Sequence, residues 1–457
     1  MKVLKFGGTS VGTVESLGNV KKIVENLKEP AVVVVSALGG LTDNLIRTAG
    51  KAASADDSYK DDFSAICKRH NNIIDNVVSP DKRDECSNKV TELLDELGRL
   101  YDGVRLIGDL PEKTLDSIVS LGERMSSVIV NAMIPNSSHV NSLEIVKTEK
   151  WFGKNIADTK LTNENIISAM KPELGHPIIA GGFISTDRDS GEITNLGRGG
   201  SDFTAALIAA ALDADVLEIW TDVDGFMTSD PRIIPEAEII PIMSFVESME
   251  LCSFGAKVIY PPTIYPVFHK NIPIKILNTF NPEAPGTLIK DFNRKELSGQ
   301  GRVRGLSALK STAIINIRGL FSQNVAAVSS RTFNTLAKRG ISVFLVSPTE
   351  DDECFSFALR ESEAEQALTL IKNEFAPEIS SRLIDEINYV GGLSIVAIVG
   401  EDILSHGTIS PRIINTLERA SISPVAISEG ASKTTVTFAV PEDKTNQTLQ
   451  LIHSLFF

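Results

Sequence analysis

The 457-residue sequence contains few of the side chains that disulfides and transition-metal sites require. Its four cysteines are widely separated, without a CxxC pair, and its six histidines are isolated, without an HExxH motif. These spacings exclude a disulfide framework and the common zinc sites. We therefore expect free thiols in a reducing, cytoplasmic compartment. The cysteines are Cys67, Cys86, Cys252 and Cys354.

Long apolar segments and an excess of positive charge are missing as well. No uninterrupted apolar run approaches the roughly 20 residues that span a bilayer. The N-terminal stretch reaches Gly7 and Gly8 too early for the apolar region of a signal peptide. The chain carries 45 Lys and Arg against 59 Asp and Glu, a net charge of −14, whereas nucleic-acid binders are usually basic. We therefore expect no nucleic acid and no membrane among its partners. This balance still leaves room for a local basic pocket that binds a small anion.

The common phosphate-binding motifs are also missing. The sequence has no P-loop of the form GxxxxGK followed by Ser or Thr, and no HRD or DFG segment. Any phosphate chemistry in this chain must therefore use other glycine turns and other cations.

Strands and helices alternate through the first part of the sequence. Val3–Phe6 and Ala31–Val35 are apolar runs, and the second is typical of a strand buried on both faces of a parallel sheet. Between them, apolar residues recur at helical spacing from Val14 to Leu27. Residues 52–104 are polar and helical in pattern, and we interpret them as a helical insertion. The expected fold is α/β, with an open, mostly parallel sheet flanked by helices. Further strands are expected at Pro177–Ile184, Val216–Trp220 and Ile272–Leu277.

An internal repeat follows a polar segment that begins near Glu283. Thr312–Gly319 and Leu393–Gly400 are similar strand-like runs, and further matches keep the same offset of 81 residues. Each copy predicts strand, helix, strand, strand, helix, a small α+β unit. The expected domains are residues 1–292, 303–390 and 391–457.

Two glycine-rich turns follow predicted neighbouring strands. The first, KFGGTS, places Lys5 just before Gly7 and Gly8, then the hydroxyl of Ser10; the second begins at Ser36 and ends at Thr42. Glycines let backbone N–H groups approach an anion closely. A Gly-Gly turn can also be a plain turn. Two turns at one edge of a parallel sheet nevertheless favour a phosphate site, with Lys5 as an exposed cation at the strand end.

A third glycine-rich segment, LGRGGSD, precedes a predicted helix. Arg198 lies between glycines, where its guanidinium could bind a carboxylate through two hydrogen bonds. Ser201 or Asp202 is a candidate cap for the helix. Three further segments carry charge: TDVDG…DPR at residues 221–232, FGAKV with Lys257, and GERMS with Glu123, which on its own predicts a surface carboxylate.

The motifs KFGGTSV, GERMS, GRGGSD, TDVDG…DPR and FGAKV, in this order, resemble aspartate kinases of the amino-acid-kinase superfamily. The repeat resembles the tandem ACT domains of that family. The resemblance implies transfer of the ATP γ-phosphoryl group to the side-chain carboxylate of L-aspartate, giving 4-phospho-L-aspartate on the way to lysine, threonine and methionine. No GxGxxG dinucleotide motif follows, so we expect the monofunctional type without homoserine dehydrogenase.

The resemblance also implies residue roles. Lys5, Asp202 and Lys257 would be catalytic, with Mg²⁺ on the phosphates and protein ligands that the sequence does not identify. The implied ATP-binding residues are Lys5, Gly7, Gly8, Ser10, Thr221, Asp222, Met227, Arg232, Lys257 and Val258. The implied substrate-binding residues are Ser36, Thr42, Glu123, Arg198 and Ser201.

Regulation by an end product is implied by the ACT-like repeat. We expect a homodimer or tetramer that binds lysine, threonine or both, near Gln323–Ser330 and Ile341–Ser347. Phe344 stands where lysine-sensitive relatives tend to carry an acid. Strong inhibition by lysine alone is therefore less expected than oligomerisation, unless Glu350, Asp351 or Asp352 supplies the charge. Two other readings stay open: a related kinase acting on glutamate, acetylglutamate, carbamate or a nucleotide, and a non-catalytic amino-acid sensor.

Overall fold

The computed structural model describes the chain except residues 152–153, 292–302, 320–324, 349–353, 402, 404–408 and 430–433. The chain forms two compact units. The first unit comprises Met1–Phe226, Ile239–Phe245 and Val258–Asn293. The second comprises Met227–Glu238, Val246–Lys257 and Arg294–Phe457.

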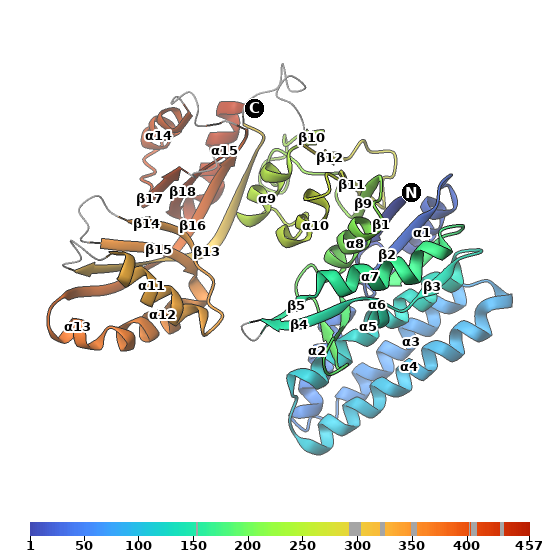
Figure 1. The fold of residues 1–457 in the computed structure, drawn as a ribbon. Helices are drawn as coiled ribbons and strands as arrows, with labels where there is room; N and C mark the ends of the chain where they lie inside the picture. The colour runs from blue at the N-terminus through green and yellow to red at the C-terminus, as the bar shows by residue number, and fades with distance from the viewer. Residues whose placement is uncertain are drawn as a thin grey trace. The chain divides into compact units, whose positions relative to one another are not determined.

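The first unit is built on an eight-stranded sheet of order β10-β12-β11-β9-β1-β2-β6-β3 (Figure 1). Strands β11, β9, β1, β2, β6 and β3 are parallel to one another, and β12 is antiparallel to β11. This arrangement confirms the expected α/β class. The strands are β1 (Lys2–Phe6), β2 (Ala31–Val35), β3 (Ser138–Val140), β6 (Ile178–Gly181), β9 (Val216–Thr221), β10 (Ile242–Met243), β11 (Ile274–Asn278) and β12 (Thr287–Ile289).

Strand β1 occupies the point where the connections of this sheet change direction. It pairs with β2 on one side and with β9 on the other, so that Lys5 lies opposite Val34 and Ile219. Every residue of β2 is buried, as its continuous β-branched run predicts. Ligands of open α/β sheets bind at the carboxyl ends of strands beside such a point. The turns after β1 and β2 are therefore at the edge where a ligand is expected.

Helices pack against this sheet, and a long helical pair accounts for the polar insertion. In Figure 1, α3 and α4 run side by side as extended helices, and a core of buried apolar side chains joins them to α5 and the sheet. The helices of the first unit are α1 (Val14–Glu25), α2 (Leu41–Ala53), α3 (Tyr59–Val77), α4 (Pro80–Ile107), α5 (Glu112–Met133), α6 (Ser142–Ile145), α7 (Thr159–Met170), α8 (Gly200–Ala211) and α10 (Tyr265–Phe268), with 3-10 turns η1 (Lys171–Glu173) and η2 (Pro261–Thr263).

The run predicted as one strand at residues 177–184 is two strands in two sheets. β6 ends at Gly181, and β7 begins at Ile184 in a four-stranded sheet of order β5-β4-β7-β8. The break falls at Gly182, whose N–H donates to the carbonyl of Val35 (2.8 Å). The strands of this smaller sheet are β4 (Lys147–Trp151), β5 (Lys154–Ala157), β7 (Ile184–Asp187) and β8 (Ile193–Asn195).

The second unit contains the repeat, as strand, helix, strand, strand, helix in each copy. The elements are β13 (Gly305–Gly319), α11 (Val325–Ala337), β14 (Phe344–Pro348), β15 (Cys354–Arg360), α12 (Glu361–Glu374) and α13 (Ala376–Ser380), then β16 (Ile384–Val399), α14 (Ile409–Arg419), β17 (Ala426–Glu429), β18 (Thr435–Pro441), η4 (Glu442–Lys444) and α15 (Thr445–Phe456). Helix α9 (Phe245–Ser253) begins at the last residue of a first-unit segment and continues in the second unit.

Both copies contribute to one six-stranded antiparallel sheet of order β14-β15-β13-β16-β18-β17. Thr312 pairs with Leu393, its own counterpart at the offset of 81 residues, and Thr312 Oγ1 donates to the Leu393 carbonyl (2.9 Å). The two copies are therefore related by an approximate two-fold axis near this pair. The sequence predicts the order of elements but not this shared sheet.

The domain boundaries stay predictions, but the two units divide the chain differently. Residues 227–238 and 246–257, which the sequence places in the first domain, belong to the second compact unit. Part of the expected effector region, residues 323–324, and the acids at 350–352 lie outside the described residues. Phe344 opens β14 and packs against a small apolar cluster. Among the described helices, none is long and apolar enough to cross a membrane.

The contact between Gly182 and α8 gives a first prediction. A Cβ at Gly182 would lie 2.5 Å from Ser201 Cβ, so Gly182→Ala must displace α8 or the end of β6. We expect a loss of about 1–3 kcal/mol in the free energy of unfolding, as for other overpacked sites. Denaturant unfolding measures the change.

Gly18→Ala is the matched control, because this glycine lies inside α1 with nothing within 4 Å of an added Cβ. It should stabilise the protein by about 0.4–1 kcal/mol. Equal effects of the two substitutions would contradict the packing argument.

Candidate active site

The turns after β1 and β2 touch each other backbone to backbone. A Cβ at Gly39 would lie 2.9 Å from the carbonyl oxygen of Gly8, and one at Gly8 would lie 3.2 Å from the carbonyl of Ala37. Only glycine permits this approach. The structure therefore brings the two predicted glycine turns together at one sheet edge. The N–H of Gly7 donates to the carbonyl of Trp220 at the end of β9 (3.2 Å), which anchors the first turn.

Lys5 is a buried cation, in contrast to the exposed strand-end cation that the sequence predicts. Its residue is 9% exposed, and Nζ lies 2.6 Å from Oδ1 of Asp202. Asp202 is itself 9% exposed and lies in the first turn of α8, which packs against β1. A Cβ at Gly7 would be 3.5 Å from the Lys5 ammonium. The ammonium is therefore fixed beside the first glycine turn.

Glu123 is also buried, so the surface position expected from its motif alone is wrong. It is 4% exposed on α5, and burial raises the pKa of its carboxyl to about 8. The Ala37 N–H donates to the carboxylate, and Oε2 has no hydrogen-bond partner among the described residues. A Cβ at Gly181 would lie 3.4 Å from Glu123 Cβ. The carboxyl group therefore belongs to the same edge, between the ends of β2 and β6.

Arg198 is held at the tip of a tight, left-handed turn. Gly197 and Gly199, on either side, have φ of 71° and 69°, and the N–H of Gly200 donates to the carbonyl of Gly197 (3.0 Å). A Cβ at Gly199 would lie 2.3 Å from Tyr260 Cβ, so this glycine also permits close packing. Arg198 is exposed. The guanidinium of Arg198 is therefore accessible to a carboxylate ligand from solvent.

Helices α2 and α8 begin at this edge without a side-chain cap. Their N-cap residues are Gly40 and Gly199, both in the left-handed region, so the predicted caps Ser201 and Asp202 are wrong. Both residues lie inside the first turn of α8 instead, and Ser201 is 9% exposed against Gly182. Helix N-termini that lack caps favour anions.

The two predicted hydroxyl residues of the second glycine turn, Ser36 and Thr42, are half-buried. Thr42 lies in the first turn of α2. The backbone N–H of Ser36 donates to the Phe6 carbonyl (3.1 Å).

The comparisons with known proteins agree with this arrangement. Residues 1–278 match the amino acid kinase family, and residues 396–456 match an ACT domain. The chain is 30% identical, over its whole length, to aspartokinase 1 of Arabidopsis thaliana, of which it covers 80%. The chain belongs to the amino acid kinase family, and within it to the aspartokinases.

Other relatives are larger proteins. The chain is 34% identical to a bifunctional aspartokinase/homoserine dehydrogenase of Haemophilus influenzae, with all of this chain aligned to 56% of that protein. It spans about half the length of such curated relatives. Among solved structures, E. coli aspartokinase III in complex with aspartate and ADP matches with a TM-score of 0.85 at 27% identity, over 99% of both chains. The same enzyme with lysine and aspartate matches with 0.76 at 28% identity, over 100% of this chain and 99% of that one.

The hydroxyl of Ser10 is committed to the protein itself. Ser10 is fully buried, and its Oγ lies 2.7 Å from Thr279 Oγ1 and 3.3 Å from the Trp220 carbonyl. This side chain therefore ties the first glycine turn to the ends of β9 and β11. Thr221, at the end of β9, donates to the exposed Asp222 (3.2 Å).

Sequence reasoning missed the residues that fix the loop after β9. Asp224 Oδ1 accepts hydrogen bonds from the amides of Asn278 (2.8 Å) and Asn281 (3.2 Å). Asn278 and Thr279 directly follow an apolar run that predicts a strand of the same sheet. This polar pair could have been recognised as part of the site from the sequence, because the carboxyl ends of parallel strands lie at one edge of the sheet.

Three predicted nucleotide residues belong to the second unit, while Val258 begins a segment of the first. Met227 packs against an apolar core that includes Ile398 and Phe438. Arg232 is exposed and forms a two-pronged pair with Asp230 (2.9 and 2.7 Å). Lys257 is exposed. Their roles stay predictions, as do the roles of the other site residues.

No protein cage for a metal is present in the described part of the chain, where no group of three or more His, Cys, Asp or Glu side chains could hold an ion. The side chains therefore do not fit a Mg²⁺ that is bound mainly by the protein. A Mg²⁺ carried by nucleotide phosphates and water needs no such group.

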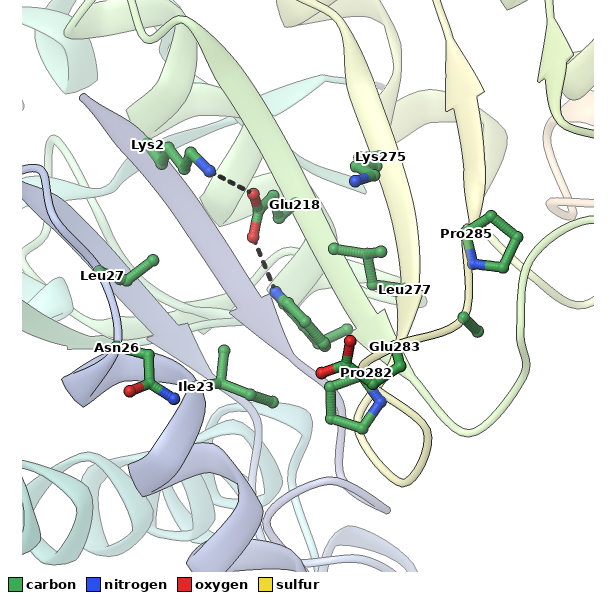
Figure 2. A pocket seen from close by; sticks show the side chains of 12 residues that line it. Lys2, Ile23, Asn26, Leu27, Glu218, Lys275, Leu277, Pro282, Glu283 and Pro285 are labelled. Carbon is green, nitrogen blue, oxygen red and sulfur yellow. Dashed lines mark hydrogen bonds and ion pairs between the residues drawn. The ribbon is translucent and has the colours of Figure 1, made fainter.

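A cavity of about 450 Å³ lies elsewhere in the first unit (Figure 2). It runs along β1, β9 and β11 toward a proline-rich loop, and none of the predicted site residues lines it. Figure 2 shows Lys2 directed toward Glu218, to which its ammonium donates (3.0 Å). The Trp220 indole N–H donates to the other oxygen of Glu218 (3.1 Å). The polar groups of Lys2, Glu218 and Trp220 are thus hydrogen-bonded to one another. The lining residues are Lys2, Ile23, Asn26, Leu27, Glu218, Trp220, Lys275, Leu277, Pro282, Glu283, Ala284 and Pro285.

The buried Glu123 carboxyl gives a prediction on stability. Because its folded-state pKa is about 8 and its ordinary value is 4.5, the folded protein binds an extra proton between these values. The free energy of unfolding must therefore fall as pH rises through this window. Glu123→Gln removes the ionisation, so its melting temperature should equal that of the parent near pH 4.5 and exceed it by a few degrees, on the order of 3 °C, at pH 8.

Thermal unfolding at pH 4.5, 6 and 8 measures this difference. Glu92→Gln, at an exposed position of α4, is the control and should show no such trend. A stabilisation by Glu123→Gln that is independent of pH would rule out the ionisation as its cause.

Proposed function

We propose that the chain is an ATP-dependent aspartate kinase, which converts ATP and L-aspartate to 4-phospho-L-aspartate and ADP. The observation that carries this proposal is the buried Glu123 carboxyl, at the same sheet edge as the Lys5–Asp202 pair. One of its oxygens has no hydrogen-bond partner in the part of the chain that the structure describes. A buried acid of this kind calls for a cation, and the α-amino group of an amino acid is one. The resemblance to aspartokinase III with aspartate and ADP, at a TM-score of 0.85, supports the same assignment.

The two ends of the amino acid would be held separately. Glu123 would bind the ammonium group, and Arg198 would bind the α-carboxylate through both arms of its guanidinium. Ser36, Thr42 and Ser201 would complete the pocket with hydroxyl groups. The side-chain carboxylate of aspartate, with an ordinary pKa of about 3.9, is already ionised at neutral pH. The reaction therefore needs no general base.

The phosphates would occupy the glycine turns. The Lys5 ammonium and the Gly8 amide would bind them, with Asp202 holding Lys5 in position. Gly7, assigned to the same site, would shape the turn, because its own N–H donates to the Trp220 carbonyl (3.2 Å). A carboxylate oxygen of aspartate attacks the γ-phosphorus, and the bond to the oxygen bridging the β- and γ-phosphates breaks, leaving ADP. Catalysis of this kind rests on positioning and on positive charge around the transferred group.

The remaining roles extend the proposal to the nucleotide and to regulation. Mg²⁺ on the phosphates would neutralise part of their charge. Lysine, threonine or both would bind the repeat as effectors, and the protein would act as a homo-oligomer. The further residues assigned to the nucleotide by the resemblance are Ser10, Thr221, Asp222, Met227, Arg232, Lys257 and Val258.

The function is tested by trapping the acyl phosphate with hydroxylamine. We expect an aspartyl hydroxamate from ATP and L-aspartate, and none when glutamate, acetylglutamate or carbamate replaces aspartate. Colorimetric detection of the iron–hydroxamate complex measures it. Hydroxamate from another acceptor alone would assign a different kinase, and none from any acceptor would favour a non-catalytic sensor.

Substitution of Lys5 tests the phosphate assignment. Lys5→Met keeps most of the side-chain volume but removes the ammonium, so kcat should fall at least a hundredfold, corresponding to about 2.7 kcal/mol. Because the change leaves Asp202 buried and unpaired, the double variant Lys5→Met/Asp202→Asn separates lost charge from lost stability.

Lys2→Met, at the other end of β1, is the matched control and should retain its turnover. A Lys5→Met protein that is folded and keeps more than a tenth of kcat would remove Lys5 from the catalytic assignment.

A further inference from the structure

The turn that carries Arg198 is tied to helix α5 by a chain of two hydrogen bonds. The side-chain amide of Asn195 donates to Asp116 Oδ1 (2.5 Å), and the backbone N–H of Gly197 donates to Asn195 Oδ1 (2.9 Å). Asp116 is 9% exposed, in the second turn of α5. One buried carboxylate thus reaches the backbone next to Arg198 through a single side chain.

The turn has a hydrogen bond of its own, from the Gly200 N–H to the Gly197 carbonyl (3.0 Å), but this bond does not connect it to α5. Gly197 and Gly199 are free of the restrictions that a Cβ imposes, and both have positive φ. Arg198 makes no hydrogen bond or ion pair with other described residues, so it does not hold itself in place. The Leu196 N–H, which donates to the Phe183 carbonyl (2.9 Å), fixes one side of the turn. The Asp116–Asn195 link holds the next residue, Gly197, so both contacts fix the segment that leads into Arg198.

Helix α5 also carries Glu123, seven residues after Asp116. Two helical turns separate them, so both side chains lie on the same face, about 10 Å apart along the axis. Two hydrogen bonds from the Arg124 guanidinium to Glu96 of α4 (2.8 and 3.0 Å) brace the helix. A single rigid element therefore supports the group assigned to the substrate amine and the turn assigned to its carboxylate.

We propose that Asp116 is a positioning residue, which through Asn195 sets the place of Arg198 relative to Glu123 and so the affinity for the amino-acid substrate. This inference rests on the proposed function for its kinetic consequence, but not for its structural one. Burial raises the pKa of Asp116 to about 6, so at neutral pH the carboxylate is ionised and accepts a charge-assisted hydrogen bond from the Asn195 amide.

The kinetic test uses Asp116→Ala, Asn195→Ala and their combination. Each single change should raise KM for aspartate about tenfold while kcat and KM for ATP change less than twofold. Because both changes break the same link, KM for aspartate in the double variant should be no higher than in the single variant with the higher KM. Asp116→Asn, which keeps an acceptor oxygen, should restore most of the affinity. Arg198→Lys sets the scale, because a point charge cannot replace the guanidinium fork.

Ser117→Ala is the matched control, since Ser117 is the next residue of α5 and its hydroxyl donates within that helix, to the Lys113 carbonyl (3.0 Å). It should leave both KM values unchanged. Effects on aspartate and ATP that are equal, or that add in the double variant, would overturn the proposal and leave Asp116 a purely structural role.

A second test does not depend on catalysis. Trypsin cleaves after arginine, and a tight turn resists it, so cleavage between Arg198 and Gly199 reports how firmly the turn is held. Mass spectrometry should show cleavage about tenfold faster in Asp116→Ala and Asn195→Ala than in the parent, and unchanged in Asp116→Asn and Ser117→Ala. An unchanged rate in both alanine variants would overturn the inference. If the parent makes no aspartyl hydroxamate yet the alanine variants are cleaved faster, the proposed function fails while the positioning role stands.

Discussion

Lys5 is a cation that the fold removes from water and places beside a backbone turn. Such a burial is unfavourable unless a carboxylate compensates for it, and Asp202 does so at 2.6 Å. The pairing requires that α8 cross the sheet next to β1, which follows from the position of β1 between β2 and β9. It also requires Gly182, since any larger residue there would displace Ser201 and the start of α8. The rest of the edge, from the glycine turns to Glu123, is arranged around this fixed charge.

A site of this kind is held by the backbone more than by side chains. The contact between Gly8 and Gly39 and the hydrogen bond from Gly7 N–H to the Trp220 carbonyl fix the glycine turns. The uncapped starts of α2 and α8 bring two helix N-termini to the same edge. Polyanions suit such a surface because amides offer partial positive charge without mobile side chains. Specificity for an amino acid then needs only a few charged groups. In the proposed assignment, Glu123 and Arg198 supply charges of opposite sign for the two ends of the amino acid.

The parts of the fold that local patterns determine could be predicted from the sequence. Ala31–Val35 is a strand because its continuous β-branched run suits a sheet covered on both faces. The repeat can be detected from sequence matches at a constant offset. Burial at the site could not be predicted in the same way. Whether Glu123 or Lys5 faces water depends on which helix crosses which strand, and that is a property of packing rather than of spacing. The committed hydroxyl of Ser10 and the Asp116–Asn195 link, formed over 79 residues of sequence, have the same origin.

The division of the chain has a consequence for how such proteins can be taken apart or recombined. The backbone passes from one compact unit to the other at 226/227, 238/239, 245/246, 257/258 and 293/294. Residues Ile234 and Ala237, encoded within the kinase region, are buried in the core of the repeat-bearing unit. Cleavage of the chain at the end of the kinase region would therefore expose the apolar side chains of Ile234 and Ala237 to water. It would also leave a cavity in the core of the repeat-bearing unit. The repeat-bearing unit is therefore not separable at the end of the kinase region, and an exchange of this unit between relatives must include residues 227–238 and 246–257.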